Sequence, residues 1–63
     1  MEFEKFIGKK LNIDVTIDEI KTEFNTENIR ILNNKTPIEF NIDWTRLNII
    51  ITENQTITLL IFG

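Results

Sequence analysis

The feature that most constrains the fold is a segment that cannot form a helix, lying between two strand-like stretches. Residues 28–32 and 47–51 are rich in β-branched side chains, which predicts strands. About a dozen residues separate them, enough for a crossover between parallel strands. A helix usually fills such a crossover, but Pro37 and the apolar-polar alternation of 38–45 oppose one. The sequence therefore predicts an extended, unpaired connection.

The same alternation permits a second interpretation of this segment. Ile38, Phe40, Ile42 and Trp44 alternate with polar residues, as in an ordinary half-buried strand. However, the apolar positions are even-numbered up to Trp44 and odd-numbered within 47–51. One strand cannot keep both phases on one face, so a bend or a change of role must occur near residues 45 and 46.

A short amphipathic helix is predicted before the first strand. Thr16 can cap the amide of Glu19, and the Glu19 side chain can complete a capping box. Ile17, Ile20 and Phe24 then fall on one face of a helix of about ten residues. Because so short a helix is marginal in water, we expect this face to pack on a sheet.

The two ends of the chain complete the expected domain, a single unit spanning residues 1–63. Phe3, Phe6 and Ile7 form an apolar arm that should lie against the core and end in a turn at Gly8. Residues 56–61 predict a third strand, antiparallel to the second.

Composition excludes most chemical functions. The 63 residues contain no His, Cys, Ser or Tyr, so a Ser-His or Cys-His nucleophile cannot be built and zinc lacks its usual ligands. Glu39 and Asp43 are candidate paired carboxylates, but so short a chain cannot form the closed cleft that a hydrolase needs. We expect neither an enzyme nor a metal or other cofactor.

Charge and hydropathy limit the partners and the location. The net charge is −3 and no basic cluster occurs, which argues against nucleic acid and anionic membranes. No apolar run is long enough to span a bilayer, and the N-terminus does not resemble a signal peptide. We expect a soluble chain, cytoplasmic or secreted after processing.

Three stretches resemble the potato inhibitor I family, which includes the barley chymotrypsin inhibitors and eglin. Residues 3–9 (FEKFIGK) are similar to the opening of that family, and 36–49 are similar, without a gap, to its reactive loop and following strand. Residues 59–63 match its apolar last strand and terminal glycine. The resemblance implies an α+β fold: one helix packed on a small mixed sheet, with two parallel strands joined by an exposed protease-binding loop.

The resemblance also implies a function and its residues. The chain would be a monomeric, substrate-like, reversible inhibitor of subtilisin- or chymotrypsin-type serine proteases. Phe40 would be the specificity residue and Phe40–Asn41 the scissile bond. The binding loop would comprise Thr36, Pro37, Ile38, Glu39, Phe40, Asn41, Ile42 and Asp43.

Loop support departs from the family pattern. Arg46 matches one of two supporting arginines, whereas Asn48 stands at the position of the other. Glu39 replaces the usual Thr before the specificity residue. We hypothesise that Glu39 and the Gly63 carboxylate share Arg46, since charge-assisted bidentate bonds are strong. Alternatively Glu39 is solvated.

These departures leave a second function open. The chain could be a non-inhibitory interaction module or assembly subunit that keeps the fold but docks on a partner through Ile38, Phe40, Ile42 and Trp44.

Overall fold

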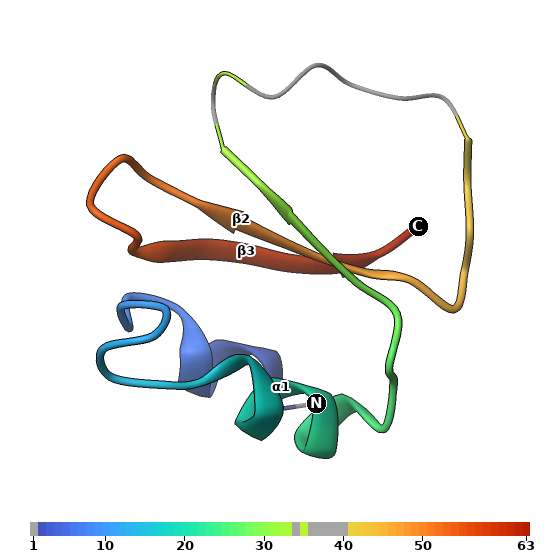
Figure 1. Ribbon diagram of the computed structural model, residues 1–63, viewed down its shortest axis with the longest axis horizontal. Helices are drawn as coiled ribbons and strands as arrows, with labels where there is room; N and C mark the ends of the chain where they lie inside the picture. Colours follow the sequence, from blue (N-terminus) through green and yellow to red (C-terminus); the bar gives the residue numbers. More distant parts are fainter. Residues whose placement is uncertain (1, 34, 36–40) are drawn as a thin grey trace.

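The structure is an α+β domain, described here from a computed structural model that covers residues 2–33, 35 and 41–63. One helix packs on a three-stranded mixed sheet, as predicted (Figure 1). The elements, in chain order, are the 3₁₀ helix η1 (Glu2–Phe6), helix α1 (Ile17–Phe24) and strands β1 (Ile29–Leu32), β2 (Leu47–Ile51) and β3 (Ile57–Phe62).

The sheet has the order β1-β2-β3, with β2 in the centre. Strands β1 and β2 are parallel and begin at the register pair Ile29 and Leu47. Strands β2 and β3 are antiparallel. The bounds of β2 are those predicted, and those of β3 are displaced by one residue. The parallel pair requires the chain to cross over between residues 32 and 47, so the segment linking the two strands returns to the start of β2.

The described end of that segment, residues 41–46, contains no strand, so it is unpaired as predicted. It is not extended throughout, because residues 44 and 45 form a turn, close to the bend predicted near residues 45 and 46. Ile42 is 67% exposed and Trp44 is 73% exposed, so the half-buried-strand interpretation is wrong for these two residues. Ile38 and Phe40 lie outside the described residues.

Helix α1 begins where its predicted N-cap places it. The Glu19 amide donates to the Thr16 hydroxyl oxygen at 3.1 Å, which satisfies one of the free amides of the first turn. Asn25 ends the helix in the left-handed conformation, with φ 53°. The helix is eight residues long, slightly shorter than predicted. Ile20 is fully buried, and Ile17 and Phe24 pack against the core.

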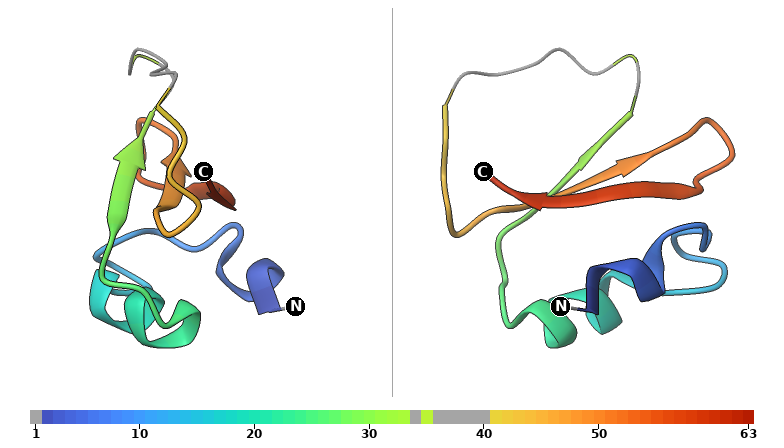
Figure 2. Two further views of the ribbon diagram at one scale, coloured as in Figure 1. Left: turned by 90° about the vertical axis from the view of Figure 1, so that its right-hand side faces the viewer. Right: turned by 180° about the vertical axis from the view of Figure 1, so that it is seen from behind.

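The core lies between the sheet and a layer formed by α1 and the N-terminal segment (Figure 2). Phe6 belongs to it, but Ile7 is 41% exposed, so the prediction that the whole arm lies against the core is wrong at Ile7. A 3₁₀ helix turns the arm, and Gly8, with φ 85°, redirects the chain so that its amide donates to the Ile57 carbonyl at 2.8 Å. The buried apolar residues are Phe6, Leu11, Val15, Ile20, Leu47, Ile49, Ile57 and Leu60.

Candidate functional site

The candidate site is the exposed end of the segment that links the two parallel strands, together with the residues that hold it. Figure 1 shows this part of the chain descending beside the C-terminus toward β2. Asn41, Ile42, Trp44 and Thr45 are exposed, whereas Asp43 and Arg46 are half-buried. The segment thus presents side chains to solvent while two of its polar residues face the domain.

Arg46 binds the two chain segments that flank it. Its Nη2 donates to the Asn41 carbonyl at 2.6 Å, and its Nε donates to the Gly63 main-chain oxygen at 3.1 Å. The Gly63 amide in turn donates to the Arg46 carbonyl at 3.0 Å. A single planar guanidinium therefore joins the linking segment to Gly63, the residue after β3.

Asn48 is the next polar residue along β2, and its side chain is enclosed, with the residue only 5% exposed. Its Nδ2 donates to the main-chain oxygens of Gly63, at 2.9 Å, and Ile61, at 3.1 Å. Its Oδ1 accepts a hydrogen bond from Arg30 Nε at 2.8 Å. Every polar atom of this amide thus has a partner, as a buried amide requires.

Asp43 organises a tight turn before β2. Its Oδ1 accepts from the Thr45 amide at 3.0 Å and from the Thr45 hydroxyl at 2.6 Å, while its Oδ2 accepts from Asn28 Nδ2 at 3.0 Å. The Arg46 amide donates to the Asp43 carbonyl at 2.9 Å. These hydrogen bonds, led by that of the Thr45 hydroxyl, lower the pKa of Asp43 from its ordinary 3.8, because they stabilise the charged carboxylate.

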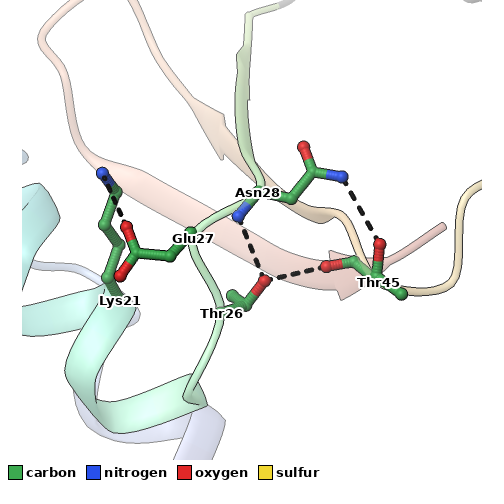
Figure 3. Close-up of polar contacts among 5 residues, drawn as sticks. All are labelled: Lys21, Thr26, Glu27, Asn28 and Thr45. Atoms are coloured by element: carbon green, nitrogen blue, oxygen red, sulfur yellow. Dashed lines mark hydrogen bonds and ion pairs between the residues drawn. The ribbon is translucent and has the colours of Figure 1, made fainter.

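The connection between α1 and β1 holds the same turn from the other side (Figure 3). The Thr26 hydroxyl donates to the Thr45 carbonyl at 2.8 Å and accepts from the Asn28 amide at 3.2 Å. The Leu47 amide donates to the Asn28 carbonyl at 2.8 Å. The end of the linking segment is thus tied to the chain just before β1 as well as to the chain just after β3.

At the other end of the segment, the structure describes residue 33 and residue 35. The Lys35 amide donates to Asn33 Oδ1 at 2.8 Å, and Lys35 Nζ lies 3.5 Å from a Glu53 carboxylate oxygen. The predicted loop residues Thr36, Pro37, Ile38, Glu39 and Phe40 lie outside the described residues. The role of Phe40 and the pairing of Glu39 therefore stay predictions.

The predicted support residues Arg46, Asn48 and Gly63 form one hydrogen-bonded group. Sequence reasoning did not single out Arg30, Asn28 or Thr26. Arg30 on β1 contacts Asn48 of this group, whereas Asn28 and Thr26, just before β1, contact the turn at Asp43 and Thr45. The sequence pattern predicts only that these three residues lie in a strand or beside it. Their role depends on strand register, which brings Arg30 opposite Asn48.

The described part of the chain has neither a metal-binding cluster nor a membrane-spanning helix. No group of three or more His, Cys, Asp or Glu residues there could hold a metal ion. None of its helices has both the length and the apolar character needed to cross a membrane.

Comparison with known proteins gives one informative likeness. No family model matches the sequence, and no curated protein matches it. Among solved structures the chain is similar to the elastase inhibitor AFUEI, in its crystal form II, with a TM-score of 0.74 and 22% sequence identity. The match covers 98% of this chain and 84% of that chain. The chain therefore shares the fold of that elastase inhibitor, while membership of the potato inhibitor I family remains a prediction.

Proposed function

We propose that this protein inhibits serine proteases of the subtilisin and chymotrypsin type by binding them as a poor substrate. Residues 36–43 would enter the active-site cleft, with Phe40 in the specificity pocket and Phe40–Asn41 as the bond attacked. The proposal rests on the fold shared with an elastase inhibitor, on the resemblance of the loop sequence, and on the way the described end of the loop is held.

The observation that carries the proposal is the double attachment of Arg46. Its guanidinium binds the carbonyl of Asn41, the first residue after the proposed scissile bond, and also the Gly63 oxygen beside β3. An ordinary surface loop needs no such link. A loop that must remain in place after the attack of a protease does.

The mechanism follows from that attachment. The protease serine oxygen would attack the Phe40 carbonyl carbon, the bond to the Asn41 nitrogen would break, and that nitrogen would gain a proton. Because Arg46 retains the Asn41 carbonyl, the new amine stays close to the acyl group. It can then attack the ester and re-form the peptide bond before water enters, so that the enzyme is occupied without net hydrolysis.

Specificity would come from Phe40. A large aromatic side chain fits the hydrophobic slot of a chymotrypsin-like enzyme and is too large for the small pocket of an elastase. Burying it would contribute about 1.5–3 kcal/mol. We therefore propose stronger inhibition of chymotrypsin and subtilisin than of elastase.

The test is inhibition of chymotrypsin, subtilisin and elastase by the intact chain and by Phe40→Ala. We expect tight inhibition of the first two enzymes by the parent and a loss of about tenfold or more in Phe40→Ala, in proportion to the apolar surface removed. Ile13→Ala is the matched control, because Ile13 is 69% exposed and lies outside the loop. A parent chain that inhibits none of the three enzymes would contradict the proposal.

A second function has one observation in its favour. Ile42 and Trp44 are 67% and 73% exposed, an unusual exposure for two large apolar side chains so close together. They would suit a non-inhibitory module that binds a partner permanently. In that case loss of binding would follow Trp44→Ala, and the chain would inhibit no protease.

A further inference from the structure

We propose that Arg30 is a positioning residue for the reactive loop and acts through Asn48 and Gly63 on Arg46. The expected effect on cleavage by a protease rests on the proposed inhibitory function. The hydrogen bonds themselves are present in the free protein. Arg30 lies on β1, opposite Asn48 on β2, and no part of the resemblance assigns it a role.

The geometry gives Arg30 control over the orientation of the Asn48 amide. Arg30 Nε donates to Asn48 Oδ1 at 2.8 Å, so the oxygen of the amide faces β1 and its nitrogen faces β3. That nitrogen donates to the main-chain oxygens of Ile61 and Gly63. A flipped amide would place its oxygen against these two oxygens and its N–H groups against the Arg30 donor, which is unfavourable at both ends.

The Gly63 oxygen links Asn48 to Arg46, which binds the loop. It accepts one bond from Asn48 Nδ2 at 2.9 Å and one from Arg46 Nε at 3.1 Å, so two donors hold it between them. With Nε bound there, the plane of the Arg46 guanidinium is set, and Nη2 lies 2.6 Å from the Asn41 carbonyl. The chain of contacts thus runs from β1 through β2 and the segment after β3 to the residue that follows the proposed scissile bond.

Burial makes the hydrogen bonds of Asn48 the consequential step of this chain. Asn48 is only 5% exposed, so water cannot readily replace a lost partner, and an unsatisfied buried amide is costly. Arg30 provides a hydrogen bond from a charged donor, which is stronger than one from a neutral donor.

Two substitutions of matched side-chain length test the Arg30 hydrogen bond. In Arg30→Gln the Nε2 atom stands at the chain position of the arginine Nε and keeps an N–H donor there. In Arg30→Met the terminal methyl group occupies that position without a donor. Lys9→Met removes one positive charge from an exposed site and serves as the charge control.

Two measurements on these full-length variants test the proposal. The first is hydrogen exchange of the Arg46 Nε–H group by NMR in the free protein. The second is the rate at which chymotrypsin cleaves Phe40–Asn41, followed by mass. We expect both rates to rise about tenfold in Arg30→Met, because one charge-assisted hydrogen bond is lost. They should rise less in Arg30→Gln, whose neutral donor keeps a weaker bond, and stay near the parent values in Lys9→Met.

Either of two outcomes would overturn the assignment of Arg30. One is that the rates in Arg30→Met equal those of the parent, and the other is that the rates in Arg30→Gln are as fast as those in Arg30→Met. If Arg30→Met does not fold, Asn48→Asp replaces it, because it keeps an acceptor for Arg30 but removes the donors to Ile61 and Gly63. Unchanged Arg46 exchange in Asn48→Asp would equally refute the relay.

The exchange measurement also separates this proposal from the function it deepens. A parent chain without inhibitory activity would refute the proposed function, whereas Arg46 exchange in the free variants would still decide whether Arg30 positions the loop.

Discussion

At the scale of single residues, Arg46 holds the loop with two different nitrogens. Nε binds the Gly63 oxygen, whereas Nη2 binds the Asn41 carbonyl. A glutamine can reproduce the first bond but not the second, since it ends at the position of Nε. The two attachments can therefore be tested separately.

We expect Arg46→Gln to be cleaved at Phe40–Asn41 about tenfold faster than the parent, because the hydrogen bond lost is charge-assisted and holds the leaving amine in place. Cleavage by chymotrypsin is followed by mass spectrometry. Thermal unfolding should change little, since the contact with Gly63 is retained. Arg46→Met, which loses both bonds, should be cleaved faster still, and equal cleavage of Arg46→Gln and the parent would count against the clamp.

The Asp43 carboxylate should make the stability of the turn before β2 depend on pH. Its pKa lies below 3.8 in the folded protein, mainly because the Thr45 hydroxyl and amide donate to the carboxylate. A carboxyl group with a lowered folded-state pKa stabilises the protein above its unfolded pKa, and that contribution is lost as the pH falls through the folded value. Asp43 should therefore contribute to stability at neutral pH and cease to do so in acid.

The expected outcome is that Asp43→Asn unfolds at a lower temperature than the parent at pH 7, with the difference shrinking progressively as the pH is taken below 3.8. Calorimetry across this range provides the measurement. Glu4→Gln is the control for removal of a carboxylate, since Glu4 is exposed and lies in η1, outside the turn. A difference between parent and Asp43→Asn that does not depend on pH would refute this role for the charge.

At the scale of elements, helix α1 shows how local chemistry sets a boundary. The Thr16 hydroxyl accepts from the Glu19 amide, and Asn25 takes the left-handed conformation that ends the helix. Both devices act over three or four residues. This is why the sequence alone located the helix to within about two residues.

Replacing the cap should destabilise the domain measurably. We expect Thr16→Ala to lower the free energy of unfolding by about 1 kcal/mol, the usual cost of losing a hydroxyl N-cap. Denaturant titration measures this change. Thr22→Ala, an exposed threonine within the same helix, is the matched control and should be neutral or slightly stabilising, because alanine has the higher helix propensity.

The strands were more dependent on their surroundings. Residues 47–51 are almost continuously apolar, which is typical of a central strand, and β2 is central in the sheet. The sequence does not predict the hydrogen-bond partners of Asn48, the one polar residue of this strand. Its contacts with Arg30, Ile61 and Gly63 arise only when β1 and β3 take their places on either side.

At the scale of the whole molecule, the proposed scissile bond divides the chain without dividing its core. Strand β1 precedes the bond, whereas β2 and β3 follow it, and β1 pairs with β2 along its length. The core likewise draws on both parts. Its members before the bond are Phe6, Leu11, Val15 and Ile20, and those after it are Leu47, Ile49, Ile57 and Leu60.

We therefore expect the form cut at Phe40–Asn41 to remain one folded particle. Residues 1–40 and 41–63 should co-elute in gel filtration under native conditions and separate in denaturant, because the buried apolar contacts between them survive the cut. Incubating the cut form with a catalytic amount of chymotrypsin should restore some intact chain. Fragments that separate without denaturant would show that the body of the domain cannot hold the new ends together.

The sequence by itself determined the helix and its N-cap, the three strands, the unpaired character of residues 41–46 and the absence of a Ser-His or Cys-His nucleophile. Each of these follows from neighbouring residues or from composition. Tertiary structure decided which polar groups meet: Arg46 with Asn41 and Gly63, Asn48 with Arg30, and Asp43 with Asn28. These partners are distant in sequence or depend on how the chain bends, so only strand register and the path of the chain bring their donors and acceptors within hydrogen-bonding distance.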